Sequence, residues 1–225
     1  MSIPSDKTEF SLWASADERQ KSFVVQVLHW FHYRPTRLRA SWTQEEVLTW
    51  ELIRAMDLLP QRLFLRPLLE QIANSSEQAR QAVHHLGPGR VAITPYPTLG
   101  LGGGKRNCKS DIGLGPEGEP PCIWIEAKTA SFKPADLDRQ LKQQESAMAQ
   151  LMPDACRLLI TLLPTQRALS DVPNLSWEGV RNALESCEDE LARSVDSDLG
   201  HGYRALAREL KQRIESHPNR AKGWV

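Results

Sequence analysis

The chain has 225 residues with 28 basic and 28 acidic side chains, so its formal net charge at pH 7 is zero. This balance gives no overall attraction to nucleic acid or to an anionic membrane, and any such surface must be local. The N-terminal residues lack the basic and apolar regions of a signal peptide. No apolar run approaches the ~18 residues that a membrane span needs. The four cysteines form no CxxC or CxxH pair, which argues against a zinc site or a disulfide framework and favours a reducing cytoplasm.

The N-terminal half of the chain predicts helices. Serine or threonine followed three residues later by glutamate is the pattern of a capping box, and proline is a common stop signal. The expected helices are one that begins at the box Ser15–Glu18 and ends before Pro35, one from the box Thr43–Glu46 to Pro60, and two at about 65–73 and 76–86.

Beyond the Gly-Pro-Gly at 87–89 the hydrophobic pattern becomes that of short strands. Two of these runs flank GPEGEPP, a glycine- and proline-rich turn that is typical of a hairpin. The expected strands are 90–94, 109–114, 122–128 and 157–163; a helix is expected near 134–152, and helices from Ser176 to about His217.

This order predicts an α/β protein whose small mixed sheet is covered by helices on both faces. The expected organisation is an N-terminal helical segment at 1–40, a core at 41–165, and a C-terminal helical extension at 166–225 that packs on the core.

The run CIWIEAK carries charges at the end of an apolar strand. Because side chains alternate between the two faces of a strand, Glu126 and Lys128 lie on the same face. If the preceding run pairs with this strand, Asp111 can lie beside Glu126. Two neighbouring carboxylates repel each other unless a positive charge lies between them. Mg²⁺ is suited to such a pair, together with phosphate and water, and a lysine beside it can orient water or stabilise charge on a phosphate.

Asp111, fourteen intervening residues and Glu126-Ala127-Lys128 together resemble the signature of the PD-(D/E)XK nuclease superfamily, which has the restriction-endonuclease-like fold. The resemblance spans about 43–163 and implies a helix, a three-stranded antiparallel run, a helix and a further strand. It implies that Asp111, Glu126 and the carbonyl of Ala127 are metal ligands and that Lys128 is the catalytic base or an electrostatic helper. Ser110 stands where the superfamily often has proline.

The function implied by this resemblance is a Mg²⁺-dependent endonuclease or other nuclease, a hydrolase of phosphodiester bonds in which Mn²⁺ substitutes for Mg²⁺. DNA is the first choice of substrate and RNA the alternative. The alternative is a catalytically inactive module of the same fold that binds nucleic acid or a protein partner. No membrane partner is expected, and a homodimer remains open. A second match to the short motif, Glu209 to Lys211, lies in a helical run, where residues two apart do not face each other.

The superfamily also implies further polar residues near the metal. A glutamate often comes from the helix before the sheet; Glu45 is the first choice here, Glu51 the alternative, and Glu46 is explained by its capping box. A polar residue often comes from the helix after the lysine. There Gln140 is the first choice and Gln144, which interrupts the apolar stripe of that helix, is the reserve.

The glycine-rich segment LGLGGGKR does not match a phosphate-binding loop, because Leu99 and Arg106 stand at positions that the motif reserves for other residues. A basic loop is the simpler interpretation. Its cations Lys105 and Arg106, with the nearby Lys109, either bind a DNA backbone or are only solvated.

Overall fold

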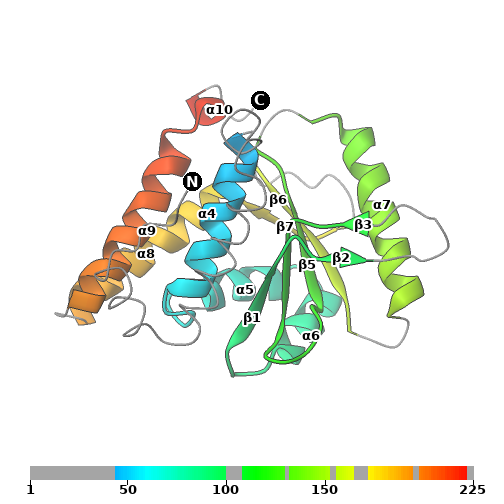
Figure 1. Ribbon diagram of the computed structural model, residues 1–225, viewed down its shortest axis with the longest axis horizontal. Helices are drawn as coiled ribbons and strands as arrows, with labels where there is room; N and C mark the ends of the chain where they lie inside the picture. Colours follow the sequence, from blue (N-terminus) through cyan, green and yellow to red (C-terminus); the bar gives the residue numbers. More distant parts are fainter. Residues whose placement is uncertain are drawn as a thin grey trace, which may run out of the picture. The chain divides into compact units, whose positions relative to one another are not determined.

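The computed structural model describes residues 44–99, 108–129, 132–152, 156–164, 172–194 and 198–221 (Figure 1). All of them belong to one compact unit, Gln44–Val225. This unit contains nearly all of the expected core together with the expected C-terminal extension. The capping box Ser15–Glu18 and the helix expected before Pro35 lie outside the described residues.

The centre of the unit is a five-stranded mixed sheet (Figure 1). The first three strands of the sheet pair antiparallel, and the last two join in parallel. The expected mixed α/β class is therefore confirmed. In their order across the sheet the strands are β1 (Val91–Pro95), β4 (Ile112–Pro116), β5 (Ile123–Ala127), β6 (Leu158–Leu163) and β7 (Asn174–Ser176).

Helices lie on both sides of this sheet, with α7 on one side and α4, α5 and α6 on the other (Figure 1). The helices expected at 65–73 and 76–86 are present within a residue of those bounds. No helix in the described part of the chain is long and apolar enough to cross a membrane. The helices are α4 (Gln44–Leu58), α5 (Leu65–Ala73), α6 (Glu77–His85), α7 (Pro134–Leu151), α8 (Trp177–Ser194), α9 (Asp198–Glu215) and α10 (Pro218–Ala221).

The strand β5 packs against helices on both faces. Trp124 lies on the face that meets α7, where Leu137 and Leu141 from the helix and Leu159 from β6 bury it. The alternate residues of β5 point to the opposite face and are fully buried there. This two-sided burial explains why the run is continuously apolar until Glu126.

The hairpin expected between β4 and β5 is confirmed, with Ile112 opposite Ile125 and Leu114 opposite Ile123. Its turn folds back over β4. A β-carbon on Gly115 would lie 2.7 Å from the carbonyl oxygen of Pro120, and that contact requires glycine.

The expected strand 109–114 is wrong in one respect, because the chain leaves the sheet at Ser110. Cys108–Lys109 forms β3, which pairs with β2 (Thr98–Leu99) in a separate two-stranded sheet. The backbone N–H of Ser110 donates to the carbonyl of Pro97 at 3.2 Å, and its hydroxyl donates to Ile125 at 2.7 Å. These bonds bend the chain between the end of β3 and the start of β4, and Asp111 lies at this bend, directly before β4.

A second correction concerns the C-terminal region. The helical run expected from Ser176 to His217 consists of α8 and α9, and Ser176 itself closes β7, which was not expected. The Ser176 hydroxyl accepts a hydrogen bond from the backbone N–H of Gly179 at 3.0 Å and so caps α8. A three-residue strand that runs directly into a helix leaves too short a pattern to detect from the sequence.

Candidate active site

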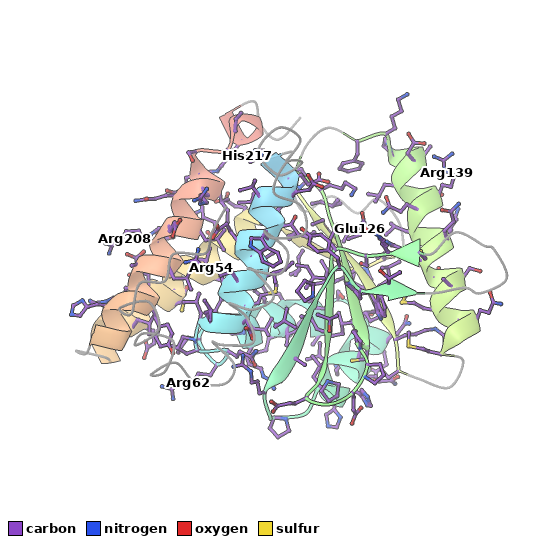
Figure 2. The ribbon with its side chains drawn as sticks, in the orientation of Figure 1. Arg54, Arg62, Glu126, Arg139, Arg208 and His217 are labelled. Carbon is purple, nitrogen blue, oxygen red and sulfur yellow. The ribbon has the colours of Figure 1, made fainter. Side chains whose placement is uncertain are left out.

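The end of β5 brings an acid and a lysine into contact. Glu126 is 2% exposed and lies on the side of the sheet that faces α7 (Figure 2). The ammonium Nζ of Lys128 lies 2.6 Å from Glu126 Oε1 and 3.0 Å from the backbone oxygen of Ala127. Burial lowers the pKa of Lys128, but the surrounding carboxylates, with Glu126 foremost, raise it by more. Lys128 is therefore held as a cation.

Asp111 joins this group across the hairpin. Its backbone N–H donates to Ile125 at 3.1 Å, and its Oδ2 accepts the backbone N–H of Ala127 at 2.8 Å. Burial and then the nearby Glu126 raise the pKa of Asp111 to about 7, although the Ala127 N–H and Lys128 act in the opposite direction. The expected closeness of Asp111 to Glu126 is thus confirmed, together with the repulsion that such closeness creates.

A third carboxylate comes from the first turn of α4. Glu45 Oε2 accepts the backbone N–H of Thr129 at 2.9 Å, and its Oε1 lies 3.6 Å from Lys128 Nζ. Glu51, the alternative considered from the sequence, forms an ion pair with Arg54 at 3.2 Å. Of the two, it is Glu45 that the structure brings to the end of β5.

A glutamine from α7 completes the surroundings of Glu126. It is Gln144, the reserve choice, whose Nε2 donates to Glu126 Oε2 at 2.7 Å and to the backbone oxygen of Lys109 at 2.6 Å. Gln140 lies half-buried one turn earlier on the same helix. Gln144 is 2% exposed, and its Oε1 has no hydrogen-bond partner among the described residues. The position of Gln144 in the apolar stripe of α7 is the feature of the sequence that predicts its burial.

This buried contact predicts a difference in stability between two neighbouring glutamines. Gln144→Glu replaces the donor to Glu126 with a like charge at nearly constant volume. The free energy of unfolding at pH 8 should fall by about 1–3 kcal/mol. The matched change Gln140→Glu should stay within about 0.5 kcal/mol of wild type. Urea unfolding measures both, and equal effects of the two changes would contradict the contact.

The charges of the site do not balance. Asp111, Glu126 and Glu45 with the single ammonium of Lys128 give a net charge of −2 when all are ionised. Burial is the first cause of the raised pKa of Asp111, and the negative charges of Glu126 and then Glu45 raise it further. A divalent cation would restore neutrality.

The donor set is of the kind that Mg²⁺ uses. In the described ranges no three His, Cys, Asp or Glu side chains are grouped so as to hold a metal ion by themselves. Mg²⁺, however, commonly binds through one or two carboxylates completed by water and phosphate. Asp111 and Glu126 supply two carboxylates beside the carbonyl of Ala127. Glu126 and that carbonyl already accept a cation, the Lys128 ammonium. The residues present therefore fit such an ion.

Tyr96 is a neighbour of the site that sequence reasoning missed. Its backbone has φ +47°, a strained value for a bulky residue, and its ring stacks on Trp50 with centroids 6.4 Å apart. Burial and then the Asp111 carboxylate raise its pKa. Its hydroxyl is buried without a hydrogen-bond partner in the part of the chain that the structure describes. Two flanking prolines mark a turn in the sequence but give no sign of this environment.

The C-terminal helices also reach the site. The indole N–H of Trp177 donates to the backbone oxygen of Lys128 at 2.9 Å. His217, between α9 and α10, is 6% exposed and lies beside the start of α4 (Figure 2). Burial lowers the pKa of His217, against the opposing effect of Glu45. Neither residue belongs to a local motif that would predict a place near the site.

Of the three basic residues predicted to contact DNA, Lys105 and Arg106 lie outside the described residues. Lys109 has an exposed side chain, and only its backbone oxygen takes part in the contact with Gln144. In the second copy of the motif, Lys211 pairs with Glu188 at 2.8 Å and Glu209 pairs with Arg213 at 3.0 Å. The residues of that second copy form ion pairs on α8 and α9.

Comparisons of the chain with protein-family models, with curated proteins and with solved structures give no match.

Proposed function

We propose that this protein is a metal-dependent nuclease that hydrolyses phosphodiester bonds in DNA. The observation that carries the proposal is the convergence of Asp111, Glu126 and Lys128 at one end of β5, with Lys128 in contact with Glu126 and with the carbonyl of Ala127. Three ionisable groups in a largely buried position cost stability, and such groups are concentrated where chemistry is performed.

The order of elements supports the same conclusion. The chain runs from α4 through α5 and α6 to β1, β4, β5, α7 and β6, with the small β2–β3 pair inserted before β4; β1, β4 and β5 are antiparallel and β6 is added in parallel. With α5, α6 and the β2–β3 pair as insertions, this is the order that the resemblance to the PD-(D/E)XK superfamily implies. Asp111 lies directly before β4 and Glu126 near the end of β5, which brings together the two acids on which the resemblance rests.

In this proposal Asp111, Glu126 and the Ala127 carbonyl hold Mg²⁺, and Glu45, 3.6 Å from Lys128 Nζ, is a further carboxylate of the site. The ion, when bound, neutralises the phosphate and makes a bound water more acidic. Gln144 holds Oε2 of Glu126, and Oε1 is the oxygen that the Lys128 ammonium contacts without metal; the ion would share or replace that contact. Lys109, Lys105 and Arg106 are the candidates for contacts with the DNA backbone.

The charge of Lys128 defines its part in the reaction. Hydrolysis forms a bond from a water oxygen to phosphorus and breaks the bond to the leaving sugar oxygen, so negative charge grows on the phosphate oxygens. In the metal-free protein the surrounding carboxylates raise the pKa of Lys128, against the effect of burial, and favour its ammonium form. The ammonium can stabilise the developing charge. Of the two roles considered from the sequence, we infer the electrostatic one.

The test is cleavage of supercoiled plasmid DNA by the purified protein. We expect nicked or linear product with Mg²⁺ or Mn²⁺ and none with EDTA. Parallel incubations with single-stranded DNA and with RNA define the substrate class. A folded protein that cleaves none of these substrates with either ion would contradict the proposal and favour a binding module that lacks catalysis.

A further inference from the structure

Both polar groups of one peptide bond, the bond between Lys128 and Thr129, are held by side chains from distant parts of the chain. The backbone oxygen of Lys128 accepts the indole N–H of Trp177, on α8, at 2.9 Å. The N–H of Thr129 donates to Glu45, on α4, at 2.9 Å. Lys128 is the first residue beyond β5, and its own N–H still bonds to β6. Beyond that bond, the direction of the chain depends on these two contacts.

Trp177 is itself held firmly. It is fully buried, and it follows directly on β7, whose Leu175 pairs with Leu162 on β6. The same Leu162 accepts the backbone N–H of Lys128 at 2.8 Å. Lys128 is thus tied to β6 through its N–H and, through Trp177, to the helix that begins where β7 ends. Because both its N–H and its carbonyl are hydrogen-bonded to these neighbouring elements, the Lys128 backbone has little freedom to rotate.

From this arrangement we propose that Trp177 is a positioning residue of the active site: its indole N–H fixes the Lys128 backbone so that the ammonium meets Glu126 and the Ala127 carbonyl. The inference rests on the proposed nuclease function. It gives the C-terminal extension a part in catalysis, because α8 supplies one of the two side chains that hold the peptide after Lys128.

The alternative role for Trp177 is packing alone, since it is one of the largest fully buried side chains. The hydrogen bond and the packing can be separated by an isostere. Trp177→β-(3-benzothienyl)alanine replaces the indole N–H with sulfur and keeps the bicyclic shape. The matched control is the same replacement at Trp124, a buried tryptophan on β5 whose indole N–H donates to the backbone oxygen of Pro121 at 3.1 Å. The control loses the same kind of bond away from Lys128.

We expect the replacement at Trp177 to lower kcat for plasmid cleavage about 10-fold while KM stays within about twofold, because small misplacements of a catalytic group cost rate rather than binding. Amide hydrogen exchange at Lys128 and Thr129 should rise about 10-fold, and exchange at Ile123–Ile125 should not change. The replacement at Trp124 should leave kcat and the exchange at Lys128 and Thr129 at their wild-type values.

An unchanged kcat in the Trp177 protein would overturn the proposal. So would faster exchange throughout β5, which would show a loss of packing alone. If the wild-type protein cleaves no nucleic acid, the proposed function fails, and the exchange data still decide the position of Lys128. A rise confined to Lys128 and Thr129 would support the role of Trp177, and no rise there would refute it.

Discussion

Replacing Lys128 by alanine is expected to reduce the rate of plasmid cleavage at least about 100-fold, the usual effect of losing one electrostatic stabiliser in an active site. The ammonium is the only cation that the described residues place against Glu126 and the Ala127 carbonyl. Removing it leaves the developing charge on the phosphate without this partner. Glu126→Gln and Asp111→Asn should reduce cleavage by at least as much, because each removes a carboxylate that would hold the ion.

The chain offers a control in its second copy of the motif. Lys211 also follows a glutamate by two residues, but it pairs with Glu188 on the helices. Lys211→Ala should cleave within about twofold of wild type when assayed well below its unfolding temperature, since an ion pair near the surface contributes ~1 kcal/mol or less.

Binding of Mn²⁺, measured by electron paramagnetic resonance, separates the role of Lys128 from that of the carboxylates. Lys128→Ala should still bind the ion, and the double variant Asp111→Asn, Glu126→Gln should not. Full activity of a folded Lys128→Ala protein would exclude the assignment.

The parts of the site that could be predicted are those that a local pattern encodes. An apolar run that ends in charge, a glycine- and proline-rich turn, and an acid in the preceding run together define a hairpin whose charges meet. This pattern predicts both Asp111 and Glu126. The bend at Ser110 could not be predicted, because it depends on bonds to Pro97 and Ile125, which lie far away in the sequence.

For the two glutamines of α7, the hydrophobic pattern of the helix predicts the residue at the site better than the resemblance does. The resemblance favoured Gln140, whereas the apolar stripe of the helix, Leu137, Leu141 and Met148, places Gln144 on the buried side. A polar residue in such a stripe needs a partner, and Gln144 has one in Glu126. Trp177 could not be found in this way. A buried tryptophan in an apolar stripe is consistent with packing alone, and its hydrogen bond to Lys128 depends on the arrangement of β6, β7 and α8.

The charge imbalance of the site leads to a prediction about stability in the absence of metal. The folded-state pKa of Asp111, about 7, lies above the ordinary value of 3.8. The folded protein therefore holds a proton that the unfolded chain releases, and its stability falls as the pH rises from about 4 to about 7. Asp111→Asn keeps an acceptor for the Ala127 N–H but removes the charge. Without metal, its free energy of unfolding should exceed that of wild type by an amount that grows through this pH range and then levels off.

A divalent ion should reverse this order, because it binds the folded carboxylates and not the unfolded chain. At about 100 times the dissociation constant, Mg²⁺ or Mn²⁺ should stabilise the wild-type protein by ~2.7 kcal/mol. Asp111→Asn should gain much less, since it has lost one of the two carboxylates. Thermal unfolding at pH 5 and pH 8, with the ion or with NaCl of equal ionic strength, measures both effects. Equal stabilisation of the two proteins by the divalent ion would show that Asp111 is not a ligand. A difference between them that does not change with pH would show that the pKa of Asp111 is not raised in the folded protein, where burial and then the neighbouring Glu126 favour a proton on Asp111 near neutral pH.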